Sequence, residues 1–140
     1  CNFWNLPFAI HFYLVDTLGY SLEAVNNLLQ KHSGMLGLTG YSDLRDIEAK
    51  AENGDEECKL ALDMNAYRIK KFIGSYAAIL NGLDAIVFTA GIGENSSLIR
   101  KLVCTDMDFL GIELDAAKVK ILVIPTNEEI EIANQVYDLL

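Results

Sequence analysis

The stretch DAIVFTAGIGENSS, residues 84–97, decides the fold of this chain. A short apolar run rich in strand-forming residues ends at Gly91-Ile92-Gly93, and a polar cluster typical of a helix start follows. This order predicts a buried strand over 84–90 that enters a helix over 95–103 through a tight turn. Such a turn presents backbone N–H groups, and its glycines leave room for a phosphate. A plain structural turn fits the same letters, so the motif alone leaves both interpretations open.

A second strand-to-helix junction lies near the C-terminus. Residues 119–125 are mostly apolar and β-branched, and TNEE at 126–129 leads into a helix predicted over 127–139. Thr126 and Glu129 have the spacing of a capping box, in which each side chain satisfies a backbone donor of the helix start. Glu128 has no part in that box. Its carboxylate suits either a direct or water-mediated Mg²⁺ ligand or a solvated acid favoured by the helix dipole.

A third polar element is GYSDLRD at 40–46, after a glycine-punctuated segment. Asp43 or Ser42 can cap the helix that follows. Arg45 can pair with a neighbouring carboxylate on the surface, or it can lie against a nucleotide base or its phosphates, because guanidinium both stacks and forks hydrogen bonds. Both interpretations remain open at this point.

The rest of the chain is read as helices around these elements. We expect helices over 8–18, 21–30, 43–53 and 55–80, a loop over 34–40, and a short turn at Gly111. The helix over 8–18 is apolar nearly all round, which is typical of a buried helix. Helices that alternate with two buried strands indicate an α/β fold, and 140 residues is the size of one domain.

Composition narrows the function classes. A net charge of −9 argues against a broad nucleic-acid surface, although it leaves room for a nucleotide pocket that uses local backbone dipoles. The sequence has no apolar run long enough to span a membrane. Three widely spaced cysteines favour a reduced, cytosolic chain. A hydrophobic content of 51% suggests that another domain or a second subunit covers part of the surface.

Taken in this order, these elements resemble the C-terminal part of the acetate kinase family, within the acetate and sugar kinase/Hsp70/actin superfamily. The matching words are SGMLGLTG (33–40), SDLRD (42–46), LD (62–63), AYRIKK (66–71), DAIVFTAGIGEN (84–95), FLGIELD (109–115) and VIPTNEE (123–129). The resemblance covers residues 8–140. It implies an α/β, actin-like ATPase (ribonuclease H-like) fold, with this chain as a single C-terminal nucleotide-binding domain that lacks the N-terminal, acetate-binding half.

The same resemblance implies a chemistry. Acetate kinases transfer the γ-phosphoryl group of ATP reversibly to acetate, giving acetyl phosphate and ADP, with Mg²⁺, and they are cytoplasmic homodimers. Glu128 would bind Mg²⁺, and no catalytic residue falls within this chain, which is not expected to be a working kinase alone. The residues that the resemblance assigns to the adenosine pocket and the nucleotide site are Asp43, Leu44, Arg45, Gly91, Ile92, Gly93, Glu94 and Asn95.

The chain departs from the family pattern in two places. Residues 1–8 lack the family's Gly-Asp-Leu-Asp-Pro-like stretch, and the chain runs almost directly from Asp115 to Val119, where the family has a longer segment. Two alternatives remain. One is a butyrate or propionate kinase of the same family, since acyl selectivity lies in the absent half. The other is a non-catalytic, self-associating module, because the helices over 8–18 and 55–80 should leave a large apolar patch.

Overall fold

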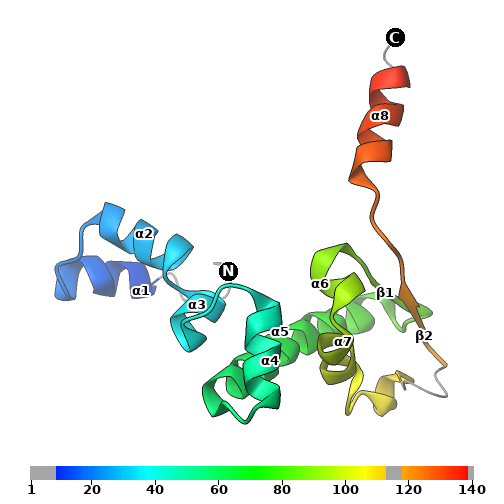
Figure 1. Cartoon of the computed structure of the whole chain (residues 1–140), viewed down its shortest axis with the longest axis horizontal. Helices are drawn as coiled ribbons and strands as arrows, with labels where there is room; N and C mark the ends of the chain where they lie inside the picture. The colour runs from blue at the N-terminus through cyan, green and yellow to red at the C-terminus, as the bar shows by residue number, and fades with distance from the viewer. Residues whose placement is uncertain (1–8, 113–117, 139–140) are drawn as a thin grey trace. The chain divides into compact units, whose positions relative to one another are not determined.

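The computed structural model describes residues 9–112 and 118–138 (Figure 1). The divergent start of the chain and most of the segment between Asp115 and Val119 lie outside the described residues. The chain divides into two compact units, Cys1–Leu62 and Asp63–Leu140. The long helix α5 (Glu56–Leu80) begins in the first unit and continues in the second.

The first unit is helical. Its elements before α5 are α1 (Ala9–Phe12), the π-helical turn η2 (Tyr13–Thr17), α2 (Leu22–Lys31), α3 (Gly34–Thr39) and α4 (Leu44–Glu52). Two of the predicted helix starts are confirmed by their caps. The Ser21 side chain accepts a hydrogen bond from the Ala24 N–H at 3.1 Å, and Asp55 Oδ1 accepts one from the Cys58 N–H at 3.0 Å. These bonds satisfy donors that the first helical turn leaves free.

Two expectations for the first unit are wrong. The glycine-rich segment predicted as a loop is the short helix α3, and Gly40 ends it with a φ of 76°. Gly37 lies within this helix, and a Cβ there would come within 3.0 Å of the His32 carbonyl oxygen, so close approach rather than loop flexibility explains that glycine. The helix predicted over 8–18 is not a buried one, since α1 and η2 contain no buried residue.

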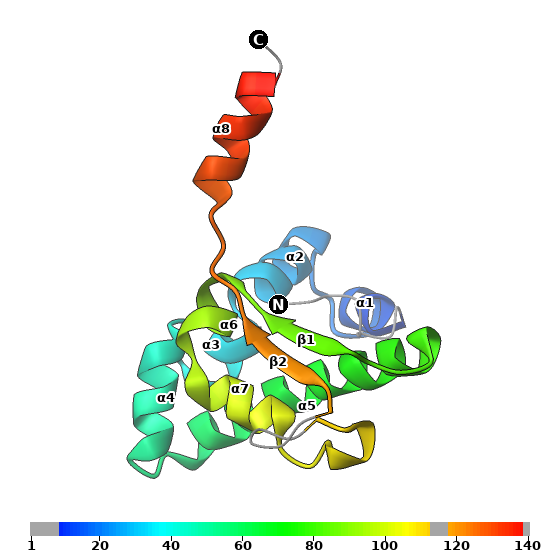
Figure 2. The same cartoon turned by 90° about the vertical axis from the view of Figure 1, so that its right-hand side faces the viewer.

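The second unit holds the sheet. After α5 come β1 (Ala85–Phe88), α6 (Ala90–Asn95), α7 (Ser97–Cys104), the 3₁₀ turn η3 (Asp108–Leu110), β2 (Lys120–Val123) and α8 (Glu128–Asp138). In the described residues the sheet has two strands, which run parallel with Ala85 opposite Lys120 and Phe88 opposite Val123. Figure 2 shows the two strands side by side. Both predicted strands are confirmed as strands, with bounds shorter than the apolar runs. The expectation that they are buried is wrong, because Phe88 is the one buried residue among those of β1 and β2.

The core of the second unit lies around α7 and the ends of the strands. Ile99 and Val103 on α7 are buried, as are Phe88 at the end of β1 and Val119 just before β2. Ser96 is buried too, and its Oγ caps α7 by accepting a hydrogen bond from the Ile99 N–H at 3.0 Å. The predicted helix over 95–103 is thus confirmed in its second part, where the cap and an apolar face coincide.

Much apolar surface stays exposed, as the composition predicts. Tyr67 is 63% exposed, Tyr76 58% and Ile79 77% on α5, and Val87 in β1 is 50% exposed. Exposed apolar side chains thus occur on both the long helix and the sheet. Within the described residues, none of the helices combines the length and the apolar character that crossing a bilayer requires. The two cysteines that the structure describes, Cys58 and Cys104, are free and buried.

Candidate functional site

The parallel pairing of the strands brings two turns to one edge of the sheet. The Ile124 N–H donates to the Phe88 carbonyl oxygen at 2.9 Å, just beyond the last paired residues of β1 and β2. The turn that starts at Thr89 and the segment that follows β2 therefore leave the sheet next to each other. In open α/β sheets, ligands bind beyond the carboxyl ends of the strands, which is this edge.

A side chain of the first turn holds the second segment. Glu94 Oε1 accepts hydrogen bonds from the Thr126 N–H at 2.7 Å and from the Thr126 hydroxyl at 2.9 Å. These two bonds keep the pKa of the Glu94 carboxyl below its ordinary value, and the bond from the Thr126 backbone N–H has the larger effect. Both bonds favour the ionised form of the carboxyl group. We call this pair the Glu94–Thr126 link.

A second side chain fixes the main chain of α6. Arg100, which is half-buried on α7, donates from Nη1 to the carbonyl oxygens of Gly93 at 2.7 Å and Glu94 at 2.8 Å. The last carbonyls of a helix have no partner within it, and a guanidinium is well suited to satisfy them. Nothing in the sequence around Arg100 points to the carbonyls six and seven residues earlier, so this role is not predictable from local pattern.

The two glycines of the motif serve different purposes. Both lie in α6 rather than in a loop before the helix, because Ala90 adopts the positive φ (59°) that the turn requires. A Cβ on Gly93 would come within 3.1 Å of the Phe88 carbonyl carbon, whereas a Cβ on Gly91 would meet no atom within 4 Å. Gly93 thus permits close packing of helix on strand, and Gly91 faces open space.

The start of α8 differs from the predicted capping box. Asn127 Oδ1 accepts the Ile130 N–H at 3.1 Å, so Asn127 is the N-cap residue. The Thr126 hydroxyl is already bonded to Glu94. The prediction that Thr126 and Glu129 cap this helix is therefore wrong, and the reason is a partner 32 residues away that local spacing cannot reveal. Glu128 is the first residue of α8, and its side chain lies outside what the structure describes.

This geometry makes a prediction about stability. Asn127→Ala should lower the free energy of local unfolding of α8 by about 1 kcal/mol, the usual cost of losing an N-cap side chain. Glu129→Ala, the matched variant in the same turn, should change it by less than about 0.5 kcal/mol. Amide hydrogen exchange along α8 measures both. Equal losses in the two variants would restore the capping box.

The first unit places Asp43 and Arg45 together at the start of α4. The Asp43 side chain caps the helix by accepting the Arg45 N–H at 2.9 Å, and it also accepts Nε at 3.0 Å and Nη2 at 2.5 Å from the Arg45 guanidinium. Of the two predicted cap residues, Asp43 is the one used. Arg45 pairs with it rather than with a later carboxylate, and its side chain is 87% exposed. Leu44 is half-buried.

The pair has a measurable pH signature. The side-chain hydrogen bonds from Arg45, then the bond from its backbone N–H, lower the pKa of Asp43 to about 2, against ~3.9 in an unfolded chain. Because the folded value is the lower one, the stabilisation from ionised Asp43 is present above about pH 4 and is lost as the pH falls through about 2. We expect NMR titration to give a midpoint near 2, and Arg45→Ala to raise it. An ordinary midpoint in both chains would contradict the pairing.

The described side chains contain no ready-made metal centre. Among them, no group of three or more His, Cys, Asp or Glu residues is placed to hold an ion. Mg²⁺ at phosphoryl-transfer sites is commonly held by one or two carboxylates, with water and phosphate oxygens completing its shell. A single carboxylate in the first turn of α8 is compatible with that manner of binding.

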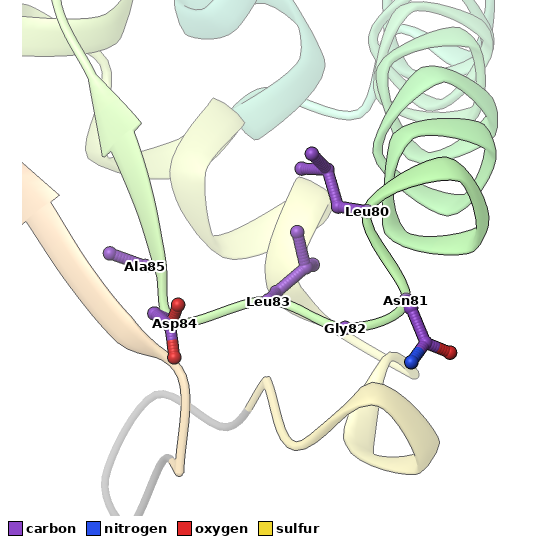
Figure 3. A pocket seen from close by; sticks show the side chains of 6 residues that line it. All are labelled: Leu80, Asn81, Gly82, Leu83, Asp84 and Ala85. Atoms are coloured by element: carbon purple, nitrogen blue, oxygen red, sulfur yellow. The ribbon is translucent and has the colours of Figure 1, made fainter.

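A hollow in the second unit lies away from this edge. It has a volume of about 500 Å³ and is lined by residues 80–85, which join α5 to β1 (Figure 3). It therefore lies at the amino end of β1, opposite the turn at Thr89. Ligands of α/β sheets bind at the other end, so we assign this hollow no role in the site.

The predicted site residues fall into two groups. Gly91, Ile92, Gly93, Glu94 and Asn95 lie on α6 in the second unit, next to the segment that leads to α8. Asp43, Leu44 and Arg45 lie at the start of α4 in the first unit. Sequence reasoning missed Arg100, and it misassigned Thr126 to a local cap.

Comparison with known proteins gives consistent matches. A sequence profile described as the acetokinase family matches residues 4–134. An acetate kinase of Flavobacterium johnsoniae is 63% identical over 149 residues, which cover 94% of this chain and 38% of that protein. An acetate kinase of Carboxydothermus hydrogenoformans is 48% identical over 152 residues, which cover 97% of this chain and 38% of that protein.

Solved structures give the same picture. The crystal structure of Porphyromonas gingivalis acetate kinase matches with a TM-score of 0.85 and 38% identity, over 94% of this chain and 37% of that one. A propionate kinase from Francisella tularensis matches with a TM-score of 0.84 and 38% identity, over 91% of this chain and 37% of that one.

This chain thus spans about 38% of the length of the curated relatives that it matches. The matches to those relatives run over 149 and 152 positions although the chain has 140 residues. The relatives therefore carry additional residues inside the matched region.

Proposed function

This chain belongs to the acetokinase family, and we propose that it forms the C-terminal, nucleotide-binding domain of an acetate kinase. Its α/β architecture is the actin-like ATPase fold of its structural neighbours. The proposed reaction is a reversible, Mg²⁺-dependent transfer of a phosphoryl group from ATP to the carboxylate of acetate, giving acetyl phosphate and ADP. The chain supplies the nucleotide side of that reaction and no catalytic residue.

The observation that carries this proposal is the meeting of two segments at one edge of the sheet. Gly91 faces open space in the first turn of α6, so a phosphate can approach the backbone there without meeting a side chain. The Glu94–Thr126 link holds the segment that leads to Glu128 beside this turn. A phosphate-approach site and a carboxylate are the two parts that a Mg²⁺–nucleotide complex needs from this domain.

Individual roles follow from these positions. Gly91 and Ile92 are exposed on α6, and the Asn95 side chain closes the helix by donating to the Gly91 carbonyl oxygen at 2.8 Å. We assign these residues to the nucleotide, with Gly93 supporting the turn. Asp43, Leu44 and Arg45 would contact the adenosine. The exposed Arg45 guanidinium is intrinsically planar, its two bonds to Asp43 fix its orientation, and it therefore has the shape to stack on a base.

Glu128 would hold Mg²⁺. When bound, the ion would neutralise charge on the phosphoryl group during transfer. The protein's part is to position a carboxylate at the start of α8, and Asn127 sets that start through its cap.

The same family membership supports a proposal for the location, the oligomeric state and the partners of the enzyme. We infer a cytoplasmic homodimer with small-molecule substrates and without nucleic-acid or membrane partners. The net charge of −9 opposes binding to a polyanion. Exposed apolar side chains on α5, such as Tyr76 and Ile79, support burial against a second subunit or another domain.

A propionate kinase is the second candidate. The Francisella tularensis propionate kinase matches this chain with a TM-score close to that of the Porphyromonas gingivalis acetate kinase and with the same identity. The acyl group is thus not distinguished by this part of the fold. Comparing kcat/KM for acetate, propionate and butyrate in a full-length kinase that contains this chain decides between them.

The proposal is tested first by binding and then by activity. Isothermal calorimetry of the 140-residue chain should show ADP binding at one site that strengthens when Mg²⁺ is added. For activity, the chain replaces the matching 38% of Flavobacterium johnsoniae acetate kinase, and the hybrid should form acetyl phosphate. A chain that does not bind ADP, together with an inactive hybrid that is folded by circular dichroism, would contradict the proposed function and favour the non-catalytic module.

A further inference from the structure

We propose that Glu94 is a positioning residue, which, with Arg100 as its support, sets where the Thr126–Glu128 segment lies relative to the α6 turn. This assignment rests on the proposed function. It gives Glu94 a role different from the direct nucleotide contact that the family resemblance implies. The two charged side chains form one connected arrangement that runs from α7 through α6 to the segment after β2.

The first support is that both Thr126 donors point to the same carboxylate oxygen of Glu94, at 2.7 and 2.9 Å. One of these donors is the backbone N–H, so the bond fixes the main chain and not only a side chain. Charge-assisted bonds of this kind are stronger than neutral ones. An oxygen that already accepts two hydrogen bonds is poorly placed to receive a nucleotide group as well.

The second support is the short distance along the chain from the link to the proposed metal ligand. Only Asn127 lies between Thr126 and Glu128, and its side chain caps α8. The direction in which α8 starts is therefore set by the Thr126 backbone on one side and by the Asn127 cap on the other. A change at Glu94 is expected to act on Glu128 through these two residues.

The third support is that the main chain at Glu94 is itself fixed by hydrogen bonds. Arg100 bonds the carbonyl oxygens of both Gly93 and Glu94, which fixes the backbone from which the Glu94 side chain extends. Gly93 is also packed against Phe88. The carboxylate thus extends from a rigid base, which is what a group that positions another segment requires.

A structural test uses the chain alone. Thr126→Val removes the hydroxyl bond, Glu94→Ala removes both bonds, and Thr126→Ser keeps a hydroxyl donor. Thr105→Val is the matched control, because the Thr105 hydroxyl bonds only within its own helix end, to the Lys101 carbonyl oxygen at 2.7 Å. We expect the Thr126 amide to exchange about tenfold faster in Glu94→Ala. The rate should stay at the wild-type value in Thr105→Val. An unchanged rate in Glu94→Ala would overturn the proposal.

A functional test separates positioning from direct contact. Replacing a residue that contacts the nucleotide directly weakens ADP binding whether or not Mg²⁺ is present. Replacing a positioning residue reduces only the additional affinity for ADP that Mg²⁺ provides. We therefore expect calorimetry to show that Glu94→Gln and Thr126→Val each reduce about tenfold the gain in ADP affinity that Mg²⁺ gives. ADP binding measured in EDTA should be unchanged in both variants. Thr126→Ser should restore the gain, and the double variant should be no worse than either single one.

The outcomes distinguish this inference from the proposed function. Weaker ADP binding in EDTA for Glu94→Gln, with losses that add in the double variant, would make Glu94 a direct contact and overturn the inference while supporting the function. A wild-type chain that binds no ADP, together with an inactive but folded hybrid, would contradict the function. The amide exchange of Thr126 still decides in that case whether the link exists.

Discussion

Gly93→Val will destabilise the chain by about 3 kcal/mol, while Gly91→Ala will leave its free energy of unfolding within about 1 kcal/mol of wild type. A Cβ at position 93 meets the Phe88 main chain at 3.1 Å, and valine adds two methyl groups beyond it. Moving the backbone of a paired strand, or a helix whose carbonyl groups are bonded to Arg100, would cost additional free energy. At position 91 the added methyl group meets no neighbour.

Urea unfolding followed by circular dichroism measures both variants, and ADP calorimetry completes the comparison. Gly91→Ala should weaken ADP binding about tenfold, because its methyl group occupies the space through which a phosphate would approach. We expect the valine at position 93 to harm the fold more than it crowds the nucleotide, because its Cβ meets the Phe88 main chain. If Gly93→Val unfolds at the wild-type urea concentration, the tight packing of α6 on β1 is wrong.

Glu128→Ala in the hybrid enzyme should reduce turnover about 100-fold or more and raise the magnesium concentration needed for half-maximal rate. The reason is that Mg²⁺ neutralises charge on the transferring phosphoryl group, and losing its protein ligand removes several kcal/mol of transition-state stabilisation. The melting temperature should not change by more than a few degrees, since an acid in the first helical turn contributes less than about 1 kcal/mol.

Glu129→Ala is the matched control for this variant, because it removes the same charge one residue further along α8. Its turnover and magnesium requirement should equal those of the wild type. A magnesium titration of activity on the three proteins gives the answer. The same magnesium dependence in all of them would leave Glu128 as an ordinary acid at a helix start.

The sequence predicted most of the elements because their signals are local. The predicted helix starts at Ser21, Asp43 and Asp55 are confirmed by side-chain caps, and such starts are predictable because a cap residue and the N–H group that donates to it lie two or three positions apart. The strand over 84–90 is confirmed for its central residues. The turn that follows was harder to predict, because Ala90 rather than a glycine takes the positive φ, and this lets the helix begin five residues early.

The contacts that define the candidate site are not local, and those were missed. Thr126 has the spacing of a capping residue, yet its hydroxyl bonds Glu94, which lies on a different element. Arg100 likewise acts on carbonyls of the preceding helix. The family resemblance located the right segments, but it could not say that Gly93 serves packing and Gly91 faces open space. That distinction depends on where the Phe88 backbone lies.

The short parallel sheet has one more consequence, which concerns how the chain behaves at high concentration. Parallel sheets are normally covered on both faces, yet Val87 and Val123 are about half exposed here. Each of the two described strands also pairs along one edge only, so the outer N–H and C=O groups of β1 and β2 are a template for a further strand. A longer polypeptide containing this chain would need to shield those edges with strands of its own. Without such shielding, the edges direct self-association and precipitation.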